Sequence, residues 1–229
     1  MEEVINFLNQ EKMVKNSFYL TYVFLLTTAT VTFIEAMRTK NYKVRHILNL
    51  ETCISVVAAY FYGKFVEQIS GERVNYRKIN MTRYVDWFIT TPIMLLVLCL
   101  AFLYNTGGNL HFVTFLKILA INFAMLTSGY LGESRKLDRN ISLMVGFLFF
   151  FMLYGFIYYK FLYKKEIFDN LILYWAFFTF WIMYGVVYNL PEKTKNVCFN
   201  YLDLFAKCFV GIFFWAYFTG VFTLKKSGI

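Results

Sequence analysis

Two apolar stretches of the sequence carry charged side chains. One begins RYVDWFITTP and holds Arg83 and Asp86, and the other reads YLDLFAKCFV and holds Asp203 and Lys207. A charge within a bilayer costs about 3 kcal/mol or more, so it is usually paired or functional. A lysine amine in an apolar pocket can condense with an aldehyde to form a Schiff base, whose positive charge needs a nearby anion. The alternative is a buried ion pair that only fixes helix packing, although such pairs often barely offset their desolvation.

The composition places these stretches in a membrane. Of the 229 residues, 59% are hydrophobic, 22% are aromatic and 16% are charged, whereas a soluble domain is roughly 25% charged. We therefore expect a multi-pass integral membrane protein whose main partner is the lipid bilayer. The net charge of +9 is scattered over loops, which argues against a nucleic-acid partner. The four cysteines lie in or beside apolar runs without a CxxC pair or a histidine cluster, so we expect packing thiols and no metal site.

Seven stretches are long and apolar enough to cross a bilayer, which takes about 20 residues. Their expected bounds are 17–37, 47–66, 82–104, 112–131, 141–163, 170–190 and 199–223. The joints are short and polar, which predicts an all-α membrane protein, a seven-transmembrane-helix up-and-down bundle, with residues 1–229 in one domain. Long unbroken apolar runs argue against a barrel. Lysine and arginine divide almost evenly between the two sides, so the positive-inside rule leaves the orientation open.

Four motifs resemble those of one family. RYVDWFITTP is similar to the helix 3 motif of the microbial (type 1) rhodopsins, and DLFAK is similar to their helix 7 motif. WIMYGVVY resembles their helix 6 pocket motif but has Gly185 where proline is usual, and GYLGE resembles the end of helix 4 in proteorhodopsin-like members. The resemblance extends over essentially the whole chain. Its short loops and lysine-rich joints are similar to those of the giant-virus rhodopsins, which would place it in a plasma or internal membrane of the host cell.

The resemblance implies all-trans retinal covalently bound to Lys207 as a Schiff base, an extracellular N-terminus and a cytoplasmic C-terminus. It implies Asp86 as counterion and proton acceptor, together with Asp203, Arg83 and Thr90. The retinal pocket it implies consists of Trp87, Thr91, Met94, Trp181, Tyr184 and Tyr188. Retinal proteins are photoreceptors, so no enzymatic activity is expected.

Ion movement depends on residues outside the pocket. In outward proton pumps of the family, a carboxylate eleven residues after the acceptor returns the proton, and here that position is Val97. Glu51, in the cytoplasmic half of the second span, is a candidate substitute donor or a wall of an ion path, unless it only bonds a neighbouring helix. The other candidates for lining a path are Ser17, Thr27, Thr28, Thr30, Glu35, Asn80 and Asn200. Each polar group also has a simpler explanation in helix-helix hydrogen bonding, and Glu35 in a cytoplasmic cap.

Three functions follow from these residues. The missing donor at Val97 and the polar groups of the first and seventh spans favour a light-gated cation channel, conducting monovalent cations or protons. The alternative is a light-driven outward proton pump with Glu51 as a relocated donor. A photosensor that signals through a partner membrane protein is the third. A homo-oligomer is expected in each case.

Overall fold

The computed structural model describes residues 2–71, 74–165 and 167–220, and their regular structure is helical throughout. The helices are α1 (Glu2–Arg38), α2 (Tyr42–Ile69), α3 (Tyr76–Thr106), α4 (Phe112–Glu133), α5 (Arg139–Ile157), α6 (Phe168–Val187), α7 (Glu192–Asp203) and α8 (Val210–Phe218). Two π-helical segments, η1 (Tyr158–Leu162) and η2 (Leu204–Phe209), continue α5 and join α7 to α8 without a break. The described residues therefore form seven helical rods and no strand, and the predicted fold class is confirmed.

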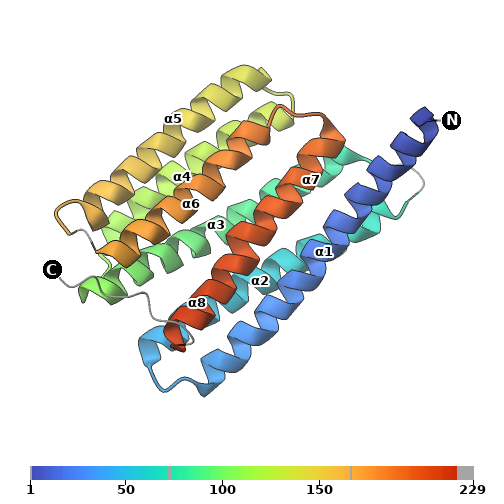
Figure 1. The fold of residues 1–229 in the computed structure, drawn as a ribbon. Coiled ribbons are helices and arrows are strands. Elements are labelled where there is room, and N and C mark those ends of the chain that lie inside the picture. Colours follow the sequence, from blue (N-terminus) through green and yellow to red (C-terminus); the bar gives the residue numbers. More distant parts are fainter. Residues whose placement is uncertain (1, 72–73, 166, 221–229) are drawn as a thin grey trace.

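The rods form an up-and-down bundle (Figure 1). Each rod packs on the next one in the sequence, and α1 also packs on α7 and α8, which closes the ring. In contrast, α4 and α5 do not pack against α7, η2 or α8, so these two groups of helices lie on opposite sides of the bundle. We call the end where α1 begins the N-terminal end and the opposite one the C-terminal end.

Several rods extend beyond the predicted spans. The first rod begins at Glu2 rather than at 17, and the seventh begins at Glu192 rather than at 199. These extensions are polar, so a search for apolar runs cannot find them, although their backbone forms the same helical hydrogen bonds. The predicted end of the last span, 221–223, lies outside the described residues.

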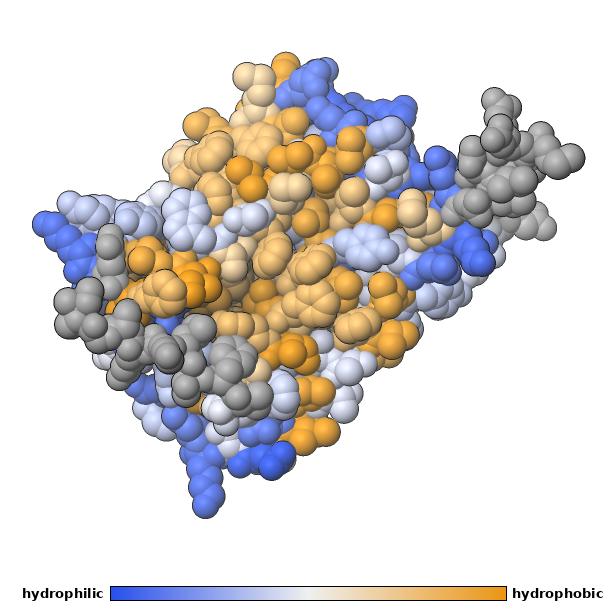
Figure 2. Space-filling view, in the orientation of Figure 1, coloured by the Kyte–Doolittle hydropathy of each residue, from blue (hydrophilic) through white to orange (hydrophobic). Residues whose placement is uncertain are grey.

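Six rods meet the length and hydropathy expected of a membrane span, and α2 does not. Its sequence contains Glu51 and Lys64, which lower its mean hydropathy. The surface nevertheless has the pattern of a membrane protein. Figure 2 shows hydrophobic side chains over the middle of the bundle and hydrophilic ones at its ends.

Polar residues specify several helix ends. Asn41 begins α2 by accepting hydrogen bonds from the backbone of Lys43 and Val44, and Asp138 begins α5 in the same way. Gly107 ends α3 with a φ of 72°, a left-handed conformation that favours glycine. These caps fix where α2, α3 and α5 start and stop, and hence the depth of the side chains they carry.

Candidate functional site

The four charged residues singled out in the sequence meet at the centre of the bundle. The Nζ atom of Lys207 lies 2.6 Å from Asp86 Oδ2 and 3.5 Å from Asp203 Oδ1. Arg83 Nη1 lies 3.1 Å from Asp203 Oδ2. All four side chains are at most 2% exposed. Two carboxylates thus balance two cations, which allows the charges to share a site that excludes water.

The backbone around Lys207 is unusual. Lys207 lies in the π-helical segment η2, and Asp203 is the last residue of α7 before it. Short π-helical segments within α-helices are frequent at functional sites. The segment presents the amine of Lys207 to α3, where Asp86 is buried.

The two carboxylates differ in how fully they are hydrogen-bonded. Asp203 accepts hydrogen bonds from the hydroxyls of Tyr62 at 2.8 Å and Tyr184 at 2.7 Å, besides its bond from Arg83. Asp86 accepts one from Lys207 through Oδ2, but its Oδ1 is buried with no partner among the described residues. Donors fix Asp203 as an anion, whereas Asp86 retains a free oxygen that can take up a proton.

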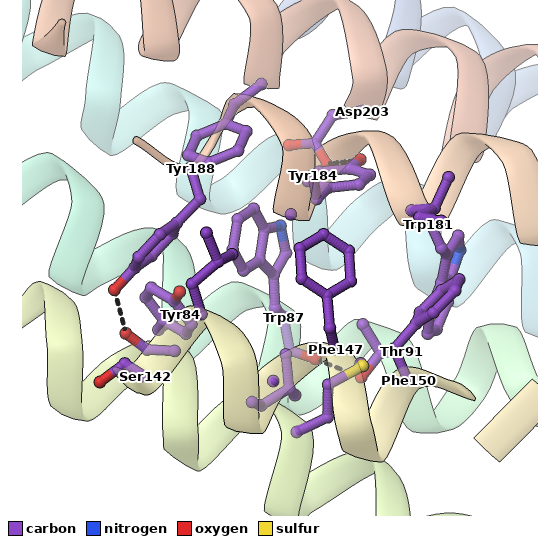
Figure 3. Close-up of a pocket in the computed structure, with 18 of the residues that line it drawn as sticks. Tyr84, Trp87, Thr91, Ser142, Phe147, Phe150, Trp181, Tyr184, Tyr188 and Asp203 are labelled. Carbon is purple, nitrogen blue, oxygen red and sulfur yellow. Dashed lines mark hydrogen bonds between the residues drawn. The ribbon is translucent and has the colours of Figure 1, made fainter. Parts of the chain in front are cut away.

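A cavity of about 120 Å³ adjoins this cluster. Lys207 and Asp203 line one side of it, while α4 and α5 line the side away from α7. Figure 3 shows the aromatic side chains of Trp87, Trp181 and Tyr184 around it. Its lining is mostly apolar, with the amine as the reactive group. Such a pocket suits an elongated hydrophobic ligand that carries an aldehyde.

The structure places all six predicted pocket residues on this cavity, namely Trp87, Thr91, Met94, Trp181, Tyr184 and Tyr188. Thr90 is buried but is not part of the lining, and its hydroxyl donates to the carbonyl oxygen of Asp86 at 2.9 Å. Sequence reasoning missed Asn122, whose amide donates to Thr91 at 2.8 Å, although an asparagine in an apolar run was a usable signal. It also missed Tyr62, since one tyrosine among 18 carries no signal.

Amide side chains continue the cluster towards the N-terminal end. Arg83 Nη2 donates to Asn200 Oδ1 at 2.8 Å and to Asn196 Oδ1 at 3.3 Å. Asn200 in turn donates to Ser17 Oγ at 2.9 Å, and Asn196 donates to Asn80 Oδ1 at 3.1 Å. Three of the residues predicted to line a path, Asn200, Ser17 and Asn80, therefore belong to one hydrogen-bonded network. Its amides bond to one another and to Nη2 of Arg83, while Nε of Arg83 has no partner among the described residues.

A second buried group of charges ends this network. Lys195 is 0% exposed, and its Nζ lies 3.1 Å from Glu133 Oε1 and 2.9 Å from Glu192 Oε1. Asn80 donates to each carboxylate at 2.7 Å. Glu133 and Glu192 also line a surface cavity of about 690 Å³ at this end of the bundle. This group was not predicted from the sequence, because Lys195 and Glu192 lie in a polar run that is typical of a loop between two spans.

Glu51 occupies the opposite half of the bundle. Its side chain is buried at 2% exposure, and it receives no hydrogen bond within the described part of the chain. A Cβ added to Gly211 would lie 3.2 Å from Glu51 Oε2, so the carboxyl is one helical turn from Lys207 along the last rod. Val97 is also buried and belongs to the hydrophobic core. Glu51 is therefore a buried carboxyl without an ionic or hydrogen-bonding partner among the described residues, with Thr28 nearby across Gly211.

The threonines of α1 divide into two kinds. Thr27 and Thr30 are exposed on the outside of the bundle, where each hydroxyl donates to a carbonyl oxygen of its own helix. The hypothesis that they line an internal path is therefore wrong. Thr28 is buried beside Gly211, and Glu35 pairs with Arg38 at 3.7 Å near the C-terminal end of α1.

Comparisons with known proteins agree with this geometry. Residues 13–221 match the family described as Bacteriorhodopsin-like protein. The crystal structure of the viral rhodopsin OLPVRII shares 51% sequence identity and a TM-score of 0.87, over 92% of this chain and 99% of that chain. No curated protein sequence matches significantly.

More distant structures share the fold alone. A blue light-absorbing proteorhodopsin from Med12 is 23% identical with a TM-score of 0.71, over 89% of this chain and 94% of that one. Acetabularia Rhodopsin I is 18% identical with a TM-score of 0.77, over 92% and 95%.

The chain therefore belongs to the bacteriorhodopsin-like family and is a microbial rhodopsin of the viral group. The predicted resemblance and the multi-pass membrane location are confirmed. Membership implies a retinal bound to a lysine, and the residues present fit that group. A buried amine opens on an apolar cavity, next to a carboxylate oxygen that has no partner.

Proposed function

We propose that the protein is a light-driven proton transporter whose retinal is held by Lys207 between Trp87 and Trp181. The unequal hydrogen bonding of Asp86 and Asp203 carries this proposal. When bound, retinal supplies the absorption of visible light and a change of shape at the nitrogen of Lys207. The remaining steps belong to side chains of this chain.

Asp86 is the proton acceptor in this proposal. Its Oδ2 is 2.6 Å from the nitrogen of Lys207, within the distance for direct proton transfer, and its Oδ1 is unoccupied by any described donor. Asp203 stays ionised because three donors from Arg83, Tyr62 and Tyr184 stabilise its charge. It therefore keeps the positive charges in place while Asp86 becomes neutral.

Glu51 is the donor that returns a proton to the nitrogen of Lys207. A buried carboxyl with no hydrogen bond favours its neutral, protonated form, which is the form a donor needs. Its position near Gly211 puts it on the side of Lys207 opposite to Arg83. Protons then move from the C-terminal to the N-terminal end, which we take as the extracellular end.

A light-gated cation channel is the function that the sequence favoured, and one observation still supports it. Polar side chains from Arg83 to Lys195 lead from the site to a surface cavity. However, the side chains of this network bond to one another, and the rings of Phe18, Phe65 and Phe199 surround the guanidinium of Arg83 at 5.0 to 5.6 Å. A hydrated cation would have to separate these groups, whereas a proton needs only a change of partners. We therefore place the pump ahead of the channel.

Voltage-clamped membranes containing the pigment distinguish the two. A pump gives photocurrent of one sign at all voltages near zero, and a channel gives photocurrent that reverses with voltage. A Lys207→Ala variant is expected to bind no retinal and to stay colourless, with Lys64→Ala as the control. Pigment formation by Lys207→Ala would overturn the assignment, and a reversing current would restore the channel.

A further inference from the structure

The part of the cavity away from Lys207 carries hydroxyl groups. Ser142 of α5, Tyr84 of α3 and Tyr188 at the end of α6 all line it. Figure 3 shows these three side chains close together and away from Trp181. Since α5 does not pack against the rod that carries Lys207, this group lies at the far side of the cavity. An elongated ligand attached to Lys207 would reach it with its opposite end.

The hydroxyl of Ser142 has no partner. Ser142 is 0% exposed, and its Oγ makes no hydrogen bond with any described residue. A serine in a helix commonly bonds to its own backbone, as Ser128 does by donating to Met125 O at 2.7 Å. Ser142 makes no such bond, and it lies in the lining of the cavity beside Gly132 of α4. A buried hydroxyl left unpaired is unfavourable, which points to a partner supplied by the ligand.

The two tyrosines have hydrogen-bonding capacity to spare. Tyr188 donates to Gly129 O at 2.9 Å and keeps its oxygen lone pairs available. The hydroxyl of Tyr84 makes no hydrogen bond within the described residues. The hydroxyls of Ser142 and Tyr84, which have no partner in the described part of the chain, and that of Tyr188, which can still accept a hydrogen bond, thus line a region where a hydrocarbon would pair with none of them.

Two glycines of α4 make room for these hydroxyls. A Cβ at Gly132 would lie 2.7 Å from Ser142 Oγ and would also collide with the hydroxyl of Tyr188. A Cβ at Gly129 would lie 2.5 Å from the hydroxyl of Tyr84. Any larger residue at either place would displace a hydroxyl. The arrangement is therefore built by the packing of α4 against α3, α5 and α6.

We propose that this end of the cavity recognises an oxygen substituent on the ring of the retinal. The chromophore that fits it best is a ring-hydroxylated retinal, whose hydroxyl accepts a hydrogen bond from Ser142 and donates one to a tyrosine oxygen. An unsubstituted ring would cover Ser142 and leave its hydroxyl without a hydrogen-bond partner. This inference rests on the proposed retinal attachment at Lys207 and adds the chemical class of the ligand.

A competition experiment tests the inference. The protein, produced without retinal, is given an equal mixture of all-trans-retinal and all-trans-3-hydroxyretinal, and the bound chromophores are extracted and measured by chromatography. One added hydrogen bond predicts roughly three- to tenfold enrichment of the hydroxylated form. Ser142→Ala should bring the ratio to about one while still forming pigment. Ser128→Ala is the matched control and should keep the enrichment, since its hydroxyl is paired within α4.

Each other result is decisive. Equal uptake of the two aldehydes by the unaltered protein would show that the cavity does not recognise the ring hydroxyl. Enrichment that persists in Ser142→Ala would show that Ser142 does not bind it. Either result would overturn the inference. Pigment formation with plain retinal in that case leaves the proposed function standing. If neither aldehyde gives pigment, the proposed attachment fails, and this inference fails with it.

Discussion

The two halves of the bundle are built in opposite ways. From Lys207 to the N-terminal end, charges and polar groups from α1, α3, α4 and α7 bond to one another in one network. From Lys207 to the C-terminal end, apolar side chains dominate the interior, polar pairs such as Thr32–Thr52 and Asn105–Asn170 are separate from one another, and Glu51 has no hydrogen bond among the described residues. A network fixed by many partners holds its charges steadily, whereas a lone carboxyl changes its protonation without breaking other bonds. This difference shows how unequal hydrogen bonding on the two sides of the Lys207 amine can give proton movement a direction.

The largest expected effect concerns the acceptor at the boundary of the two halves. Asp86→Asn removes the carboxylate proposed to take the proton, and on that proposal proton transport should fall by about 10²- to 10⁴-fold. Light-induced pH change in vesicles measures it. Asp203→Asn is the contrasting variant, because its three donors lose their anion and folding should suffer as well. If Asp86→Asn transports protons as well as the unaltered protein, the unequal hydrogen bonding of Asp86 and Asp203 is not the basis of function.

Glu51 provides the test of the apolar half. Glu51→Gln removes the proposed donor, so recovery of the resting absorption after a flash should slow by about 10²-fold at neutral pH. Flash photolysis measures this rate. Glu35→Gln is the control, because that carboxyl pairs with Arg38 near the end of α1. Unchanged recovery in Glu51→Gln would assign the donor elsewhere.

Lys195 provides the test of the polar half. Lys195→Met removes the fully buried cation that Glu133 and Glu192 share. Among the described residues it leaves them only the cation of Arg139, which is partly exposed and lies 3.7 and 3.8 Å away. Removing one partner of a buried ion pair costs up to about 3–5 kcal/mol of stability. Thermal unfolding of the purified protein measures the loss. Lys64→Met changes a lysine for which the described residues provide only a contact with the ring of Tyr60, so it should have little effect. Similar unfolding of both variants would show that the network at the N-terminal end adds little to stability.

The smallest expected effect concerns the space around Glu51. A Cβ at Gly211 would lie 2.8 Å from Thr28 Cγ2 and 3.2 Å from Glu51 Oε2, so Gly211→Ala must displace one of them. We expect recovery after a flash to slow by roughly threefold, as for a loss of under 1 kcal/mol. Gly155→Ala is the control, because nothing lies within 4 Å of a Cβ there. If recovery after a flash is equally fast in both variants, the space at Gly211 does not control the position of Glu51.

The fold and the centre of the site were predictable from the sequence, and the network at the N-terminal end was not. Seven apolar runs and the motifs around Asp86 and Lys207 specify the helices and the charged cluster, because charge within an apolar run is conspicuous. Lys195 and Glu133 lie near helix ends, where a charged residue is ordinary. Their burial follows from how the rods pack, which a search for local patterns does not reach. The same limit explains the error at Thr27 and Thr30, whose outward direction depends on the rotation of α1.

The low hydropathy of α2 affects how the protein enters its membrane. Glu51 and Lys64 make this helix a poor substrate for insertion by itself. It packs closely on α1, so the pair can enter the lipid together as a helical hairpin, with the polar face of α2 shielded. The carboxyl proposed to resupply the proton is thus also the residue that makes biogenesis of the second helix dependent on the first.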